Sequence, residues 1–94
     1  MALEFTWDET KNSKNFSKHG IWFEEARTVF SDVNALELFD EAHSQDEERF
    51  VLLGLSTMPR LLIVVHCERD EKTVRIISAR KATKKEARDY EKGI

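Results

Sequence analysis

The residues best suited to chemistry are five cations that follow one another closely in the segment TVRIISARKATKK, from Thr73 to Lys85. Two are arginines, whose planar guanidinium groups match a phosphate or carboxylate through paired hydrogen bonds. Their types and spacing predict an anion-binding surface formed by Arg75, Arg80, Lys81, Lys84 and Lys85. The competing interpretation is an edge strand protected by charge, followed by a solvated helix face.

Two histidines and the single cysteine also have reactive side chains, but structural roles explain them. Gly20 is a natural helix end, so His19 in the preceding turn fits the helix dipole as a capping cation. His66 and Cys67 end the apolar run LLIVVHC. We expect a hydrogen-bonded core or interface histidine there, and a cysteine that behaves as a small hydrophobic residue.

The acidic segment from 40 to 48 could be imagined as a metal site. Its candidate ligands are Asp40, His43 and Asp46. Their spacing matches no calcium-loop or zinc pattern, so we expect a solvated connection and no metal.

The elements that must position these residues alternate between strands and helices. Helices are expected over 8–18, 23–30 and 84–92, and strands over 3–7, 35–40, 49–56, 60–68 and 73–81. The last three strands have short connections, which predicts an antiparallel meander. The order β-α-α-β-β-β-β-α predicts a small α+β domain over 1–94, an antiparallel sheet with two N-terminal helices and a C-terminal helix.

Two local patterns refine the position of the cations. Thr83 and Glu86 have the spacing of a capping box, which starts a helix directly after the strand at 73–81. Strict alternation along that strand puts Arg75 and Lys81 on one face and Arg80 on the other. We therefore expect Arg80, beside the helix N-terminus, to be the main anion contact.

Composition and charge narrow the class of protein. The chain has 94 residues, 40% of them hydrophobic, and a formal net charge of −3. Residues 21–50 carry nine acids against two arginines, whereas residues 51–94 carry ten Lys or Arg against six acids. An anion site would therefore be local to the C-terminal part. The absence of a leader or apolar span and the single cysteine favour a cytoplasmic protein.

Several motifs, taken together and in order, resemble the BrnT family of bacterial toxins. They are FTWDETKNSKNFSKHGIWFEEARTVFSD, DEERF, LLIVVHCERD and RIISARKATKKEARDYE, which span nearly the whole chain. The resemblance implies a RelE-like fold and a ribonuclease that cuts RNA to inhibit translation and growth. It also implies a BrnA-like antitoxin with a ribbon-helix-helix part, which binds the toxin in a hetero-oligomer and brings it to DNA at their own promoter. One departure is Trp22, where family members tend to carry a small polar residue.

RNA cleavage without a metal or cofactor needs a base for the 2′-hydroxyl, an acid for the leaving oxygen and cations for the phosphate. Under the resemblance, we expect Arg80 to stabilise the phosphate, with base and acid drawn from His19, His66 and Glu48. Further RNA contacts are expected from a basic set: Lys18, Arg69, Arg75, Lys81 and Lys84. Two alternatives stay open: a non-catalytic co-repressor that partners a DNA-binding protein, and a small-molecule enzyme, which so short a chain disfavours.

Overall fold

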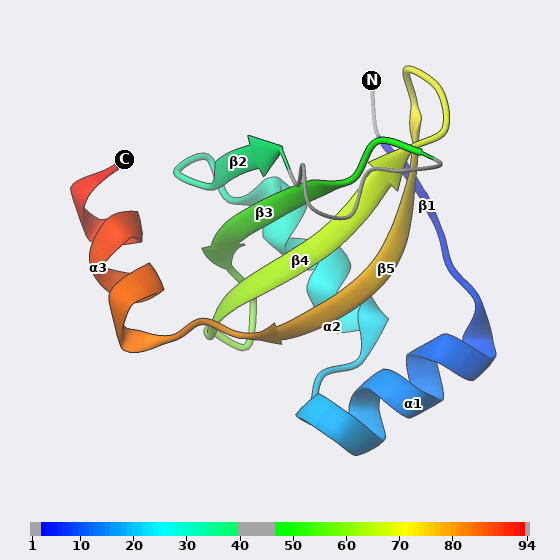
Figure 1. The fold of residues 1–94 in the computed structure, drawn as a ribbon, viewed down its shortest axis with the longest axis horizontal. Coiled ribbons are helices and arrows are strands. Elements are labelled where there is room, and N and C mark those ends of the chain that lie inside the picture. The colour runs from blue at the N-terminus through cyan, green and yellow to red at the C-terminus, as the bar shows by residue number, and fades with distance from the viewer. Residues whose placement is uncertain (1–2, 40–46, 94) are drawn as a thin grey trace.

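The computed structural model describes residues 3–39 and 47–93, which form one sheet with helices packed on one of its faces (Figure 1). The strands are β1 (Glu4–Thr6), β2 (Leu36–Phe39), β3 (Phe50–Leu55), β4 (Leu61–Glu68) and β5 (Thr73–Lys81). The helices are α1 (Glu9–His19), α2 (Phe23–Ala26), the 3-10 helix η1 (Arg27–Ser31) and α3 (Lys84–Lys92). The predicted α+β class and element order are confirmed.

The sheet has the strand order β1-β5-β4-β3-β2. Strands β2 to β5 form the expected antiparallel meander, with the apolar β4 at the centre. The short β1 runs parallel to β5, with Phe5 opposite Val74, so the sheet is mixed.

The core lies between this sheet and α1, α2 and η1. Fully buried Ile21, Phe23, Ala26 and Val29 pack on a strand-borne set made of Leu52, Leu62, Val64, Ile76 and Ala79. Gly54 on β3 allows η1 to approach closely, because a Cβ atom at this position would lie 2.7 Å from Cγ1 of Val29. Burial of this face stabilises the fold and fixes the helical layer on the sheet.

The segment expected as one helix over 23–30 divides into two. Its α-helical part ends at Ala26, and η1 continues it in the tighter 3-10 form. The Thr28 hydroxyl donates a hydrogen bond to the carbonyl of Glu25, which satisfies an acceptor near this junction. Trp22 occupies the N-cap without a side-chain cap and stacks instead on Phe16, with ring centroids 4.2 Å apart.

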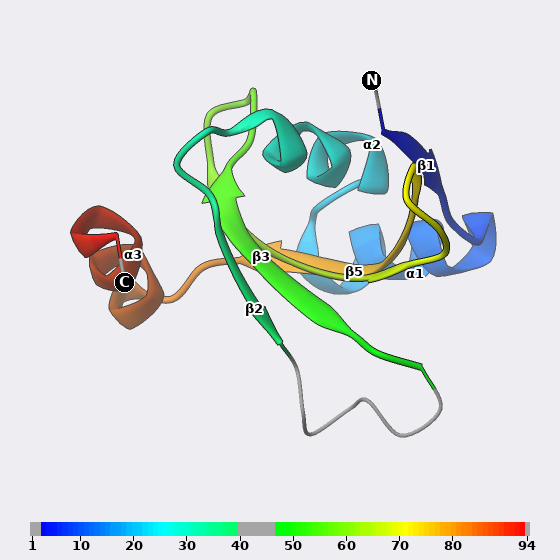
Figure 2. The ribbon, with the colours of Figure 1, turned by 90° about the horizontal axis from the view of Figure 1, so that it is seen from above.

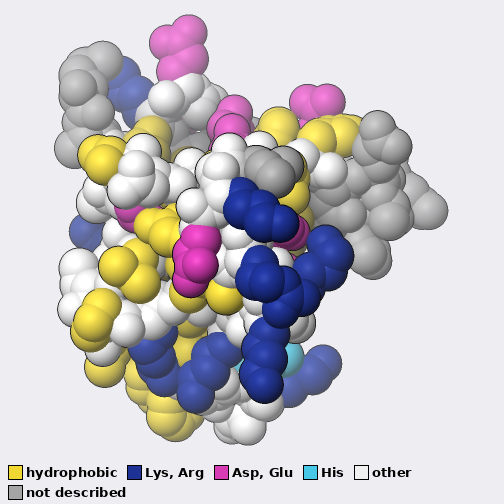
Figure 3. Space-filling view, turned by 90° about the vertical axis from the view of Figure 1, so that its left-hand side faces the viewer, with side chains coloured by type: hydrophobic (Ala, Val, Ile, Leu, Met, Phe, Trp, Pro, Cys, Tyr) yellow, Lys and Arg dark blue, Asp and Glu magenta, His cyan; other side chains and the backbone are white. Residues whose placement is uncertain are grey.

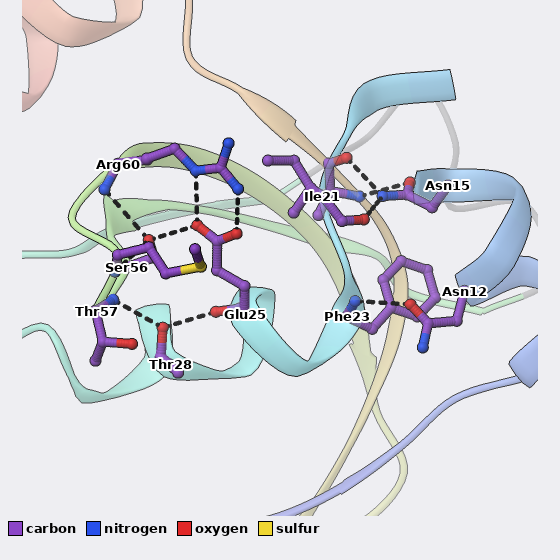
Figure 4. Close-up of polar contacts among 11 residues, drawn as sticks. Asn12, Asn15, Ile21, Phe23, Glu25, Thr28, Ser56, Thr57 and Arg60 are labelled. Atoms are coloured by element: carbon purple, nitrogen blue, oxygen red, sulfur yellow. Dashed lines mark hydrogen bonds and ion pairs between the residues drawn. The ribbon is translucent and has the colours of Figure 1, made fainter. Parts of the chain in front are cut away.

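Helix α1 is polar, yet two asparagines dock it firmly. Asp8 caps its N-terminus, and Gly20 ends it with a φ of 74°, as its glycine type predicts. The Asn15 side chain donates to the carbonyl of Ala79 and accepts from its N–H, so the amide pairs with β5 as a neighbouring strand would. Asn12 accepts from the N–H of Phe23, which ties α1 to α2 (Figure 4).

A β-bulge in β5 corrects the expected distribution of the cations. Val65 pairs with Ser78 but His66 pairs with Ile76, so Ile77 is an extra residue that shifts the alternation. As a result Arg75 lies opposite Cys67 and Arg80 opposite Ile63, on the same face of the sheet. Lys81 lies on the other face, so the prediction that it shares a face with Arg75 is wrong.

Helix α3 lies beyond one end of the sheet and does not cover its second face (Figure 2). None of its nine residues is buried. The predicted capping box between Thr83 and Glu86 is present, and the Tyr90 hydroxyl donates to Asp32 at 2.6 Å. Within the described ranges, no helix is long and apolar enough to cross a lipid bilayer.

Candidate functional site

The two arginines of β5 lie on the face of the sheet that the helical layer leaves open. Their partners on β4 are four residues apart, which separates Arg75 and Arg80 by about 13 Å along the strand. Ser78 lies on the same face between them. The bulge therefore aligns two guanidinium groups that strict alternation would have placed on opposite faces.

Helix α1 adds more cations along the same strand. A shallow cavity of about 210 Å³ is lined by Lys11, Lys14, Asn15, Lys18, His19, Ile77 and Ser78. Asn15 anchors α1 to Ala79, so the lysines of α1 (Lys11, Lys14 and Lys18) lie beside β5 between its two arginines. Lys11, Lys14, Lys18, His19, Arg75 and Arg80 are called the basic surface below.

The C-terminal part of the chain extends this positive charge. Lys84, the first residue of α3, is exposed at the helix N-terminus that follows β5. Figure 3 shows Lys and Arg side chains gathered over the centre and lower part of the face that carries α3, with acidic side chains mostly above them. The arrangement fits a polyanion that spans several phosphates, because one phosphate could not reach all these cations.

The Arg80 guanidinium is occupied by an acidic partner. Its Nη1 and Nη2 atoms each donate to one carboxylate oxygen of Glu86 at 2.9 Å. The hydrogen bonds from Arg80 hold the pKa of Glu86 at about 2, and the same contact raises the pKa of Arg80. Glu86 also accepts from the N–H of Thr83, so the pair fixes the strand-to-helix corner.

Three other predicted site residues lie away from the basic surface. His66 is fully buried on the helix-covered face, between the rings of Phe30 and Phe50. Glu48 is exposed just before β3, and Arg69 follows β4, where its Nη1 atom lies 3.6 Å from Glu47. Asp40, His43 and Asp46 lie outside the described residues.

The sequence did not predict an ionic network that joins α2 to the β3–β4 connection. The Glu25 side chain is only 5% exposed and accepts two hydrogen bonds from Arg60, one of them 3.0 Å from Nε (Figure 4). The Ser56 hydroxyl donates to the same carboxylate at 2.7 Å. Burial alone would raise the pKa of Glu25, but the bonds from Arg60 and Ser56 outweigh it and lower that pKa.

This network forms the polar wall of a groove of about 770 Å³. Its apolar part comes from the exposed side chains of Phe16, Trp22 and Met58. The motif FEEA has two glutamates that suit the first turn of a helix, and nothing in it indicates that Glu25 is buried. The partner Arg60, 35 residues further along the chain, could not be found from spacing.

Comparison with known proteins agrees with this architecture. A sequence model described as "Ribonuclease toxin, BrnT, of type II toxin-antitoxin system" matches residues 7–86. The 1.1 Å crystal structure of the Brucella abortus ribonuclease toxin BrnT is similar with a TM-score of 0.69 and 21% identity, covering 88% of this chain and 100% of that one. A search of curated proteins gave no match. The structural likeness shows the fold, and the family match, which covers most of the sequence, shows that this chain belongs to the BrnT family of type II toxin–antitoxin ribonuclease toxins.

Proposed function

We propose that this chain is an endoribonuclease toxin that binds RNA along β5 and α1. The observation that supports this most strongly is the bulge at Ile77, which aligns Arg75 and Arg80 beside the lysines of α1. Single-stranded RNA carries one charge per nucleotide, and such a row of cations binds successive phosphates.

Cleavage in this proposal uses the 2′-hydroxyl of the RNA as nucleophile and needs no metal ion. A base removes the hydroxyl proton, the oxygen attacks the adjacent phosphorus, and an acid protonates the departing 5′-oxygen. The products are a 2′,3′-cyclic phosphate and a 5′-hydroxyl. Arg80 stabilises the extra negative charge on the phosphate in the transition state.

His19 is the proposed base or acid. It is partly exposed and lines the same cavity as the three lysines of α1 and Ser78. His66 and Glu48 were the other candidates, but His66 is buried on the opposite face and Glu48 lies near the far end of β4. An imidazole beside a bound RNA can accept the proton of the 2′-hydroxyl or donate one to the departing oxygen.

The test combines growth arrest with cleavage of a labelled RNA by purified protein in excess EDTA. We expect Arg80→Ala and Arg80→Lys each to reduce cleavage about 100-fold, because neither retains the fork that binds two phosphate oxygens. His19→Gln is expected to lose a similar factor. Lys72→Gln is the matched control, since it removes one positive charge from the β4–β5 turn at the other end of the sheet.

Thermal unfolding of each variant separates chemistry from folding. If Arg80→Ala still arrests growth at unchanged stability, Arg80 is not the phosphate contact. If antitoxin-free wild-type protein leaves RNA intact while a partner-dependent DNA complex forms, the chain is a non-catalytic co-repressor instead. Loss of cleavage in EDTA alone would contradict the metal-free step.

We further propose that a BrnA-like ribbon-helix-helix antitoxin neutralises the toxin and carries it to their promoter. Family membership supports an antitoxin partner, and the ribbon-helix-helix part of that partner would supply the contacts to DNA. Coexpression of the neighbouring reading frame should restore growth. DNA binding should require both proteins, and binding by the toxin alone would contradict this assignment.

A further inference from the structure

A second group of functional side chains meets where β4 ends, far from α3 (Figure 1). His66 and Glu68 are two residues apart on β4, so both project to the helix-covered face. Glu37 reaches the same place from β2, and its Oε2 atom lies 3.3 Å from Nε2 of His66. The nearest donor atoms of Glu37, His66 and Glu68 all lie within 4.8 Å of one another.

These three side chains line a small cavity of about 140 Å³. Its wall also includes Leu3, Phe30, Asp70, Glu71 and Val74. The cavity is large enough for a cation with one or two water molecules. Asp70 is engaged in the turn, because its Oδ1 accepts from the N–H groups of Lys72 and Thr73. The donors left to face the cavity from β2 and β4 are two carboxylates and one imidazole.

The surroundings of His66 favour a ligand at its Nε2 atom. The ring is 0% exposed and held between Phe30 and Phe50, with centroid distances of 4.8 and 6.0 Å. Its Nδ1 atom lies 3.4 Å from the carbonyl of Val64, a contact that favours a proton on Nδ1. In that tautomer Nε2 carries a lone pair toward a carboxylate, and a cation between them would turn repulsion into attraction.

We propose that Glu37, His66 and Glu68 bind a divalent first-row transition-metal cation such as Zn²⁺. An imidazole with two carboxylates suits such a cation better than Mg²⁺ or Ca²⁺, which prefer all-oxygen sites. Small rotations of the two exposed carboxylates bring the donors to bonding distance. The cation would join β2 to β4 across β3 and stabilise this end of the sheet.

This site is separate from the proposed RNA chemistry. Its ligands lie on the helix-covered face, whereas Arg75 and Arg80 lie on the opposite face of the sheet. Metal binding is therefore expected to change stability and to leave metal-free cleavage in place. A direct hydrogen bond between His66 and Glu37 is the competing explanation for their contact, and it predicts no specific response to metal.

Zn²⁺ titration of the full chain without a histidine tag tests the proposal. We expect one equivalent to bind and the melting temperature to rise by about 10 °C at a hundredfold excess over Kd. Glu37→Gln and Glu68→Gln should abolish most of this rise, each judged against its own metal-free melting temperature. Both residues are exposed, so the variants should fold even if a change at buried His66 does not.

Two matched controls test where the metal binds. Glu71→Gln removes a carboxylate from the same cavity wall, and His19→Gln removes the other histidine of the described chain; both should keep the full rise. Co²⁺ should give visible absorption bands that disappear in Glu68→Gln. No rise in the wild type, or an equal rise in all four variants, would overturn the proposal.

Discussion

Two arginine–glutamate pairs, each joined by two hydrogen bonds, lie in different surroundings. Arg60 and Glu25 join the β3–β4 connection to α2, and their side chains are 31% and 5% exposed. Arg80 and Glu86 join β5 to α3, and theirs are 42% and 26% exposed. Both contacts lower the pKa of the glutamate and raise that of the arginine.

The difference in burial assigns different roles to the two pairs. Glu25 is held by Ser56 as well as Arg60, and its side chain is only 5% exposed, so water cannot readily replace these partners. Glu86 belongs to a helix without buried residues, so it can move away from Arg80 at small cost. The first pair therefore holds the fold together, whereas the second can release its arginine to a phosphate of bound RNA.

Removal of the buried carboxylate should have the largest effect. Glu25→Ala leaves the Arg60 guanidinium and the Ser56 hydroxyl without their acceptor, and we expect a loss of about 3 kcal/mol in the free energy of unfolding. Urea denaturation measures this loss. Glu91→Ala, on the exposed face of α3, is the control and should change stability by less than about 0.5 kcal/mol. A loss as small at Glu25 would mean that the network is not structural.

Removal of the exposed carboxylate should separate stability from activity. Glu86→Ala eliminates half of the capping box and the partner of Arg80, so we expect a loss of about 1 kcal/mol. RNA cleavage should be retained or increased, because Arg80 becomes free for phosphate. A gel-based cleavage assay alongside urea denaturation tests both expectations. If cleavage falls as far as in Arg80→Ala, Arg80 acts through the corner it builds with Glu86 and does not contact RNA.

The sequence predicted the elements around this second pair well. The strand 73–81, the helix 84–92 and the capping box between them have the predicted bounds, because each depends on residues close in the chain. Asp8 and Gly20 delimit α1 for the same reason. Local chemistry is sufficient where the interaction that ends an element lies within one turn of it.

The features that shape the candidate site depend on distant contacts instead. No glycine or proline marks the bulge at Ile77 in the sequence, and only the register of β5 against β4 reveals it. Asn15 and Ala79 are 64 residues apart, and a surface asparagine has the same sequence pattern as one that completes a sheet edge. The parallel pairing of β1 with β5 also joins distant parts of the chain, so the sequence pattern does not predict it. Alternation along one strand therefore misplaced Lys81 relative to Arg75.

The smallest expected effect is a difference between the two pairs in how their contributions to stability depend on pH. The pKa of Glu86 is about 2 in the folded chain, below its ordinary value of 4.5. Its contribution to stability is thus complete above pH 4.5 and is lost progressively as the pH falls toward 2. In Glu86→Gln this titration is absent, so the stability gap to the wild type should narrow over that range.

Glu25 also has a lowered pKa, so its contribution should decline with falling pH as well. Glu25→Gln, however, still leaves Arg60, whose side chain is 31% exposed, without its anion. The difference in unfolding free energy between this variant and the wild type should therefore remain substantial at pH 3. Urea denaturation of the wild type and both variants at pH 7, 4 and 3 makes the comparison. If the difference in unfolding free energy from the wild type narrows equally in both variants, the two pairs respond alike to pH. The difference in burial between Glu25 and Glu86 would then not distinguish a structural pair from a releasable one.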